Sequence, residues 1–235
     1  GSPSLITAFM ASVVKISGFF ALFKLMTIAF NGIAGDWINI LGVFIILTLL
    51  LANVMGLVQT NAKRMLAYSS VSHAGYIALI FFGINNFSTY ILGYSLATVG
   101  VFISLLWVEK IKKETSFAAF NGLGKKEPVL AVVSTVSMLS MAGIPLTAGF
   151  IGKLGIFNQV IGGHYEFLVL IAVLGSALSI AYYLKLIIAM FFFKEDNFHN
   201  TERASITYNI VSVVIILALV SMGIVPDLFA RIFGL

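Results

Sequence analysis

Two lysines and one histidine lie inside long apolar segments of this sequence. Lys15 is near the centre of the first segment, and Lys153 ends a Gly-Phe-Ile-Gly-Lys sequence eight residues after Pro145. An amine held in a low-dielectric interior can gain and lose a proton near neutral pH, and histidine titrates nearest to physiological pH. We therefore interpret Lys15, His73 and Lys153 as a candidate proton relay.

His73 belongs to a polar face within an otherwise apolar segment. Tyr68, Ser69, Ser72 and Tyr76 surround it at helical spacing, and residues three and four apart share a face of an α-helix. Such a row of hydroxyls could line a hydrogen-bonded chain of water. The alternative is a core histidine whose nitrogens are bonded within the protein.

The four lysines inside apolar segments differ in how far they lie from the end of their segment. An ionised lysine at a helix centre costs about 2.5–3.5 kcal/mol on insertion scales, so Lys15 needs polar or wet surroundings. Its alternative role is structural, with the amine paired to a carbonyl or reaching the interface. The alternative for Lys153 is a lysine near a helix end. Lys24 and Lys185 lie nearer the ends of their segments, where a long side chain can reach the headgroups.

Other polar residues in the segments are few. Tyr182 and Tyr183 precede Lys185, and the alternative to a functional role for them is interfacial anchoring. Glu109 closes its segment beside Lys110 and is expected at the interface. No acidic residue lies deep in an apolar segment, so we expect no site for a hard cation, which needs several oxygen ligands.

Motifs for cofactors and metals are missing. The sequence has no cysteine, which excludes disulfides, thiolate metal sites and thiol catalysis. The Gly122-Leu123-Gly124-Lys125 sequence falls short of a phosphate loop, because Lys126 stands where that motif needs Ser or Thr. We therefore expect no metal or cofactor in this chain, and any redox group would come from another chain.

The composition indicates the class of protein. Of the 235 residues, 60% are hydrophobic and 10% are charged, and the mean hydropathy is +1.07. Soluble domains carry about 25% charged residues, so the composition excludes a soluble enzyme and a disordered chain. The net charge of +5 does not indicate nucleic-acid binding, because most basic residues lie in short loops between apolar segments.

Seven apolar segments are long enough to cross a lipid bilayer, since a hydrocarbon core about 30 Å thick needs about 20 helical residues. We expect an all-α integral membrane protein in which residues 1–235 form a single transmembrane domain. The first segment is too long for a signal peptide and contains two lysines. The predicted spans are Leu5–Phe30, Trp37–Val58, Met65–Gly83, Thr89–Val108, Val129–Val160, Phe167–Phe193 and Ile206–Leu228.

Basic residues in the loops predict the orientation. The second, fourth and sixth loops contain nine Lys or Arg residues, and the other three loops contain none. The positive-inside rule places the nine in the cytoplasm, together with the N-terminus, and the C-terminus then lies across the membrane. The nine are Lys63, Arg64, Lys110, Lys112, Lys113, Lys125, Lys126, Lys194 and Arg203.

The fifth segment is too long for one straight span, because about 32 helical residues extend about 48 Å. It contains Gly143-Ile144-Pro145 near its middle, and proline removes a backbone donor and clashes with the preceding turn. We expect two half-helices joined by an unwound stretch, a device found in ion-coupled transporters. The alternative is an ordinary proline kink.

Several stretches resemble one family of membrane proteins. The run from Gln59 to Tyr76 resembles the signature of the antiporter-like subunits L, M and N of bacterial NADH–quinone oxidoreductase (respiratory complex I). Residues 142–153 resemble their broken twelfth helix, and residues 121–128 and the start of the chain up to Lys15 resemble subunit N. The resemblance covers nearly the whole chain, as the C-terminal half of subunit N, helices eight to fourteen.

The resemblance implies a fold and site residues. The family is built from inverted repeats of five helices, each with one broken helix, and the second repeat would occupy the second to sixth predicted spans. Lys15 matches the lysine connecting two half-channels, Lys153 the ionisable residue of the second half-channel, and His73 a member of the central polar axis. The lysine of the seventh helix and the glutamate of the fifth have no counterparts here, so part of the pumping machinery is missing.

The function implied is proton translocation in a complex. NADH, FMN, iron–sulfur clusters and quinone would be bound by partner subunits, and the expected neighbours are antiporter-like subunit M, small subunit K and the lipid bilayer. The expected location is the bacterial inner membrane, with the N-terminus cytoplasmic and the C-terminus periplasmic. Two alternatives stay open: a subunit of a multi-subunit cation/proton antiporter, and a scaffold of the membrane arm that conducts nothing.

Overall fold

The computed structural model describes residues 2–83, 87–194 and 203–226. Within these ranges the chain is helical and contains no strand, and an isolated bridge joins Asn61 and Ser116. Short 3-10 turns occur at Asn31–Ile33, Leu79–Phe82 and Phe117–Phe120. The other elements are α1 (Ser4–Phe9), the π-helix η1 (Met10–Val14), α2 (Lys15–Ile28), α3 (Ala34–Leu57), α4 (Ala62–Ala78), α5 (Phe87–Lys112), α6 (Leu123–Lys126), α7 (Pro128–Ala142), α8 (Ala148–Gly162), α9 (Glu166–Phe192) and α10 (Ile206–Ile224).

The prediction of an all-helical membrane-type protein is confirmed. Six helical stretches of the described residues are long and apolar enough to cross a membrane, and the fifth predicted segment corresponds to the shorter helices α7 and α8. Asp227 and Leu228, at the end of the last predicted segment, lie outside the described residues. The six stretches are Ser4–Ile28, Trp37–Leu57, Ala62–Phe82, Phe87–Lys112, Glu166–Phe192 and Ile206–Ile224.

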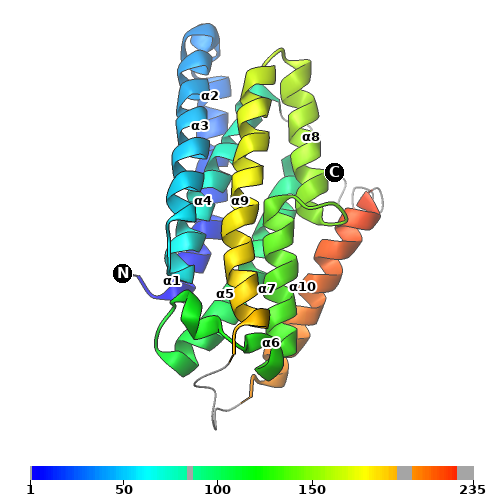
Figure 1. The fold of residues 1–235 in the computed structure, drawn as a ribbon. Helices are drawn as coiled ribbons and strands as arrows, with labels where there is room; N and C mark the ends of the chain where they lie inside the picture. Colours follow the sequence, from blue (N-terminus) through cyan, green and yellow to red (C-terminus); the bar gives the residue numbers. More distant parts are fainter. Residues whose placement is uncertain (1, 84–86, 195–202, 227–235) are drawn as a thin grey trace.

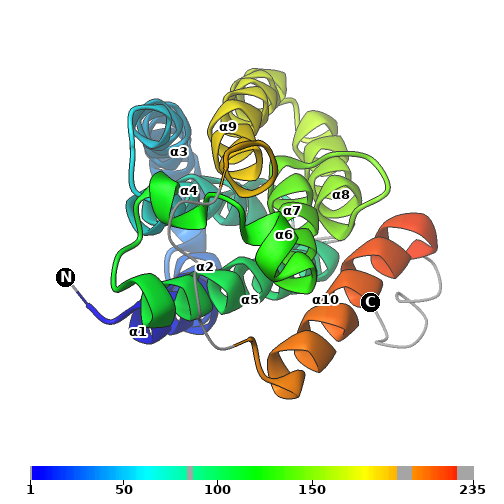
Figure 2. The same cartoon turned by 60° about the horizontal axis from the view of Figure 1, so that its bottom comes forward.

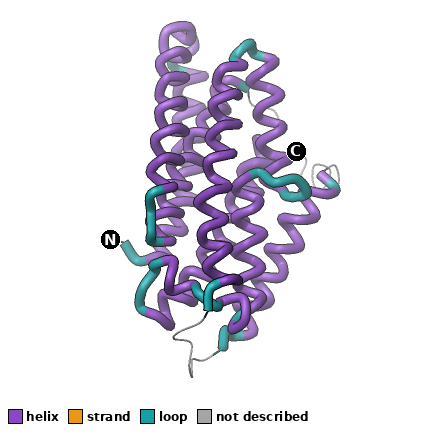
Figure 3. Tube along the Cα trace, in the orientation of Figure 1, coloured by secondary structure: helices purple, strands orange, loops and turns teal. Residues whose placement is uncertain are grey.

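The long helices run along a common axis (Figure 1). α3 packs against α4 and α9, and α5 packs against α7, α8 and α10. α7 and α8 follow one another along the bundle, and Figure 3 shows the loop between them partway along its length. The end view shows the short helix α6 next to the start of α7 (Figure 2). The interruption therefore lies within the bundle.

The loops that carry the basic residues meet at one end of the bundle. The Asn61 side chain donates to Thr115 Oγ1 at 3.0 Å, which joins the second and fourth loops. Glu127 Oε1 accepts from the backbone N–H of Ala204 at 3.0 Å, which joins the fourth and sixth. Lys63 Nζ donates to the carbonyl of Ser2 at 2.6 Å, so the start of the chain lies there too. We call this end the basic end.

Local sequence signals account for where several helices start. The side chain of Asn61 caps α4 by accepting from Arg64 N–H at 3.1 Å, which satisfies one of the free donors of a helix start. Pro128 opens α7, where its missing N–H costs nothing.

The end of α7 corrects the physical reason given for the break. Gly143 has φ +85°, and the N–H groups of Gly143 and Ile144 return to the carbonyls of Ser140 and Leu139 at 2.9 and 3.0 Å. This pair of bonds is a Schellman cap, which requires the left-handed conformation that glycine adopts freely. The glycine therefore ends the helix, and Pro145 follows where a helix could not resume.

Glycines near Lys153 bring backbones together. A Cβ at Gly152 would lie 2.5 Å from Tyr90 Cα, and one at Gly149 would overlap the carbonyl of Ser140. The space where a side chain would stand at these glycines is occupied by the neighbouring helices. Their role is to let α8 pack tightly on α5 and α7.

We predict that Gly152→Ala destabilises the fold by about 1–3 kcal/mol, the usual cost of overpacking a tight interface. The control is Gly162→Ala at the exposed end of the same helix, where a Cβ meets nothing within 4 Å. Thermal unfolding of the purified protein in detergent measures both. Equal melting temperatures for the two variants would contradict the close approach of α8 and α5.

Candidate functional site

Lys15 lies where α2 begins, directly after the π-helix Met10–Val14. Its side chain crosses to α4 and α5, and Nζ donates to the carbonyl of Ser70 at 2.8 Å, to Ser70 Oγ at 3.0 Å and to Tyr94 Oη at 2.6 Å. The Tyr94 hydroxyl in turn donates to the carbonyl of Ala11 at 2.9 Å. A π-helix shifts the backbone hydrogen bonds by one residue and is common at functional sites, and here a carbonyl within it accepts from a buried tyrosine.

Lys153 is buried at the break between α7 and α8 and is only 4% exposed. Nζ donates to the carbonyls of Met141 and Ala142, at 2.8 and 3.2 Å, and to Ser176 Oγ on α9 at 2.9 Å. The last carbonyls of a helix have no partner within it and carry a partial negative charge. The interrupted helix therefore supplies acceptors that an intact one would not offer.

His73 lies between the two lysines and is buried in α4. Its Nδ1 is 2.6 Å from Tyr90 Oη on α5. The imidazole centroid is 4.5 Å from the Tyr94 ring and 5.7 Å from the Tyr76 ring. The histidine thus contacts the tyrosine that binds Lys15 on one side and a second tyrosine on the other.

Tyr76 completes the connection to Lys153. Its hydroxyl donates to the carbonyl of Ala172 at 2.7 Å and is 2.9 Å from Ser176 Oγ, the hydroxyl that accepts from Lys153. Lys153 Nζ lies 4.5 Å from the centroid of the Tyr76 ring. Contacts therefore run unbroken from one lysine to the other. We call this set the polar axis: Lys15, Ser70, Tyr94, His73, Tyr90, Tyr76, Ser176 and Lys153.

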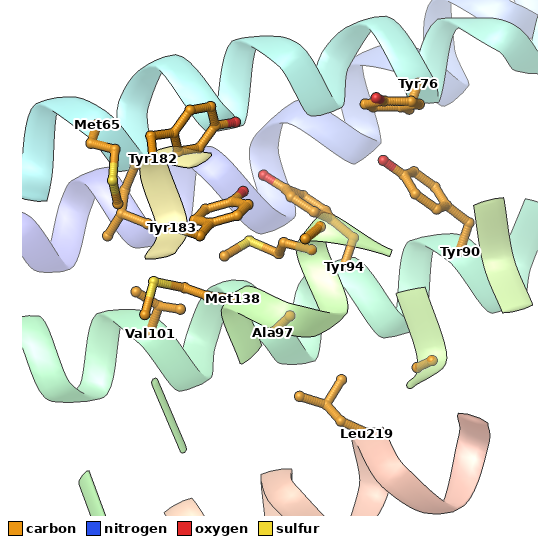
Figure 4. Packing of buried hydrophobic residues seen from close by; sticks show 14 of the residues in the cluster. Met65, Tyr76, Tyr90, Tyr94, Ala97, Val101, Met138, Tyr182, Tyr183 and Leu219 are labelled. Atoms are coloured by element: carbon orange, nitrogen blue, oxygen red, sulfur yellow. The ribbon is translucent and has the colours of Figure 1, made fainter. Parts of the chain in front are cut away.

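The polar axis has steps of two kinds. The lysine, serine and tyrosine contacts are hydrogen bonds between groups that can donate or accept a proton. The steps from Tyr94 to His73 and from His73 to Tyr76 are ring contacts. Figure 4 shows Tyr183, Tyr94 and Tyr90 in one row, with Tyr182 and Tyr76 above its two ends. A proton crossing beside His73 needs a side-chain movement or a bridging water.

Two further tyrosines extend the buried polar region. Tyr182 donates to Asn53 Oδ1 at 3.0 Å, and Asn53 donates to Ser72 Oγ at 2.8 Å. Tyr183 pairs with Ser69. Both tyrosines are 1% exposed, so the alternative of interfacial anchoring is wrong. This stretch of α9 faces α4 in the interior. The position of a residue along a helix does not reveal whether its side chain points into the protein or away from it.

The predicted polar face of α4 lies mostly inside the protein. Ser69, Ser72, His73 and Tyr76 are buried, and Tyr68 is half-buried and outside the polar axis. Sequence reasoning missed the residues that contact these side chains from other helices. The spacing of Tyr90 and Tyr94, four apart in an apolar segment, was the available signal. The missed residues are Ser70, Tyr90, Tyr94 and Ser176.

The remaining charged candidates lie away from the polar axis. Lys24 and Lys185 are exposed, and Lys185 Nζ donates to the carbonyl of Leu57 at the end of α3. Glu109 is 3.7 Å from Lys63 at the basic end. Among the residues that the structure describes, no three His, Cys, Asp or Glu side chains gather as a metal site would require.

The structure is an apolar helical bundle with two hydrogen-bonded lysines in its interior. This is the architecture of a membrane protein with ionisable groups inside the bundle. Residues 1–179 match the family described as "NADH:quinone oxidoreductase/Mrp antiporter, TM". This chain belongs to that family.

Relatives support the resemblance to subunit N. The chain is 34% identical over 236 residues to NADH-quinone oxidoreductase subunit N 1 of Herpetosiphon aurantiacus, covering 97% of this chain and 48% of the relative. Over 198 residues it is 40% identical to NADH-quinone oxidoreductase subunit N of Trichlorobacter lovleyi, and the match covers 82% of this chain and 41% of that protein. A chain in the structure of respiratory complex I from Thermus thermophilus with bound aureothin matches with TM-score 0.82 and 31% identity. The match covers 97% of this chain and 51% of that chain. The chain spans about half the length of these proteins.

Proposed function

We propose that this chain is a proton-translocating subunit of the membrane arm of an NADH–quinone oxidoreductase, equivalent to the C-terminal half of subunit N. The observation that carries the proposal is the polar axis, in which contacts link Lys15 to Lys153 through the interior of an apolar bundle. Family membership and the subunit N relatives support the same assignment.

Lys15, His73 and Lys153 are the proposed proton carriers. Each lysine amine lies among oxygens that accept from it in the protonated form. Charges interact strongly across a low-dielectric interior, so protonation of one lysine lowers the proton affinity of the other. Quinone reduction in partner subunits would drive the cycle by changing the charge at one end of the axis. The tyrosines and serines of the axis orient the amines and pass the proton.

The proposal includes a membrane topology. α7 and α8 form a single span broken at Gly143-Ile144-Pro145, which with the six long helical stretches makes seven crossings within one transmembrane domain, residues 1–235. The second to sixth spans are one inverted repeat. The basic end faces the cytoplasm, since its loops hold the nine basic residues. The N-terminus is then cytoplasmic and the C-terminus periplasmic, in a bacterial inner membrane.

The proposal also assigns partners. Subunits M and K are the expected neighbours, and NADH, FMN, iron–sulfur clusters and quinone belong to other subunits of the complex. A complete cycle also requires the lysine of the family's seventh helix and the glutamate of its fifth, which have no counterparts in this sequence. In a scaffold that conducts nothing, neutral side chains could fill the positions of the buried amines at a lower cost in free energy. The scaffold alternative therefore does not explain why lysines stand there.

Replacing either lysine tests the assignment of the carriers. In the assembled complex reconstituted in liposomes, we predict that Lys15→Ala and Lys153→Ala each lower proton pumping by ~100-fold or more, the scale expected for a lost proton-transfer group. Lys24→Ala, an exposed lysine outside the polar axis, is the control. Complex assembly and quinone binding are checked alongside. Normal pumping by both variants in an intact complex would establish the scaffold instead.

Cysteine labelling tests the topology directly, because the chain has no native cysteine. Glu114→Cys lies in the loop before α7 at the basic end, and Gly163→Cys lies between α8 and α9, both at exposed positions. With seven crossings, a membrane-impermeant maleimide added to spheroplasts labels Gly163→Cys and spares Glu114→Cys. Labelling of both or neither would mean that α7 and α8 enter and leave on one side.

A further inference from the structure

Two buried tyrosines of α5 contact the same imidazole. Tyr90 and Tyr94 lie one turn apart on this helix and are 1% and 3% exposed. Figure 4 shows them next to one another along α5. The Tyr90 hydroxyl is 2.6 Å from His73 Nδ1, whereas the Tyr94 ring lies against the imidazole, with the ring centroids 4.5 Å apart. One helix therefore contacts both a nitrogen and the ring of His73.

The hydroxyls of these two tyrosines differ in their number of partners. The Tyr94 hydroxyl accepts from Lys15 and donates to the carbonyl of Ala11. Within the described ranges, the Tyr90 hydroxyl has one hydrogen-bond partner, His73 Nδ1. A hydroxyl passes a proton along a chain only when one neighbour supplies a proton and another accepts one. Tyr90 is therefore a side branch at His73, and its hydroxyl does not lead to the next group of the polar axis.

The single partner of Tyr90 determines the direction of the hydrogen bond. If Nδ1–H donated to the phenol oxygen, the Tyr90 proton would have no acceptor among the described residues. A buried donor without an acceptor costs free energy, and buried tyrosine hydroxyls usually find a partner. Tyr90 therefore donates and His73 Nδ1 accepts. Since a neutral imidazole has one N–H and one lone-pair nitrogen, the proton of neutral His73 is on Nε2.

Close packing of α5 on α8 fixes the position of Tyr90. A Cβ at Gly152 would lie 2.5 Å from Tyr90 Cα and 2.9 Å from its N, and a Cβ at Gly93 would lie 2.9 Å from Ala148 Cβ. The two helices thus touch on both sides of the turn that carries Tyr90. Gly152 directly precedes Lys153, so the hydroxyl that binds His73 is held against the helix of the second lysine.

A fixed donor at one nitrogen gives the two imidazole nitrogens different tasks. The hydrogen bond made by one nitrogen of a histidine sets which nitrogen carries the proton. With Nε2 already protonated, an arriving proton adds at Nδ1, and the Tyr90 hydroxyl then changes from donor to acceptor. Without this hydroxyl, either nitrogen of His73 could carry the single proton, and the ring would lose its reference orientation.

We propose that Tyr90 is a positioning residue that holds His73 in one ring orientation and, when neutral, in the Nε2–H form. Each proton that crosses between the two lysine sites then adds at and leaves from defined imidazole nitrogens. This inference rests on the proposed function, in which His73 carries protons, and it goes further by assigning the tautomer of His73. It also assigns Tyr90 to orientation, apart from the tyrosines whose hydroxyls have two partners.

Removal of the hydroxyl alone tests the proposal. In the assembled complex reconstituted in liposomes, Tyr90→Phe should slow proton pumping about ten-fold, the kinetic equivalent of one lost buried hydrogen bond. The phenyl ring keeps the packing against α8. The control is Tyr165→Phe between α8 and α9, which keeps the ring contact with Phe82 at 4.6 Å and should pump at the wild-type rate.

Rescue separates the hydrogen bond from packing. Incorporation of 3-fluorotyrosine at position 90 retains the hydroxyl and should restore wild-type pumping. Incorporation of 4-fluorophenylalanine, which has nearly the size of tyrosine but no donor, should pump as slowly as Tyr90→Phe. This pair also decides the case in which Tyr90→Phe fails to assemble.

Normal pumping without the hydroxyl, or no rescue by 3-fluorotyrosine in an assembled complex, would overturn the role of Tyr90. The His73→Phe variant distinguishes this failure from failure of the proposed function. If His73→Phe pumps normally, the proposed proton carrier is wrong. If His73→Phe loses pumping while Tyr90→Phe does not, the proposed function stands and the inference about Tyr90 falls.

Discussion

The structure depends on the need of a buried amine for oxygen partners. The ammonium of a lysine has three donors and no acceptor, and leaving such donors unpaired in an apolar bundle is costly. Lys153 meets the requirement with two carbonyls and a hydroxyl. Those carbonyls are free because Gly143 ends α7 at mid-bundle. The interrupted helix, the glycine cap and the buried lysine therefore form one unit.

The same requirement accounts for the arrangement around Lys15. Its partners are the carbonyl and hydroxyl of Ser70 and the hydroxyl of Tyr94, and the π-helix supplies a carbonyl for that tyrosine. Each lysine thus sits beside a local departure from α-helical geometry, which supplies carbonyls to Lys153 itself and, at Lys15, to the tyrosine that accepts from the amine. His73 and Tyr76 fill the space between the two sites, so a chain of polar side chains replaces apolar packing along the bundle centre.

Sequence periodicity predicted what a single helix determines. The helical segments, the buried face around His73 and the interruption after Ala142 all follow from local patterns. Contacts between helices could not be predicted from the sequence, because no local pattern indicates that Tyr94 contacts Lys15 or that Ser176 contacts Lys153. Tyr182 and Tyr183 were misplaced for the same reason, since burial depends on the rotation of α9 against α4. The sequence analysis attributed the break to Pro145, because a proline is the stronger helix breaker, and it therefore did not predict the helix cap at Gly143.

We propose that protons pass between the two lysines through the interior of this chain. His73 is the group that contacts the tyrosines of both sides. The most direct measurement is proton pumping by the assembled complex carrying His73→Phe, which keeps a ring at the position and removes both nitrogens. If His73 carries the proton between the two sites, pumping is lost while the complex assembles normally. Pumping at the wild-type rate would contradict a relay through this axis.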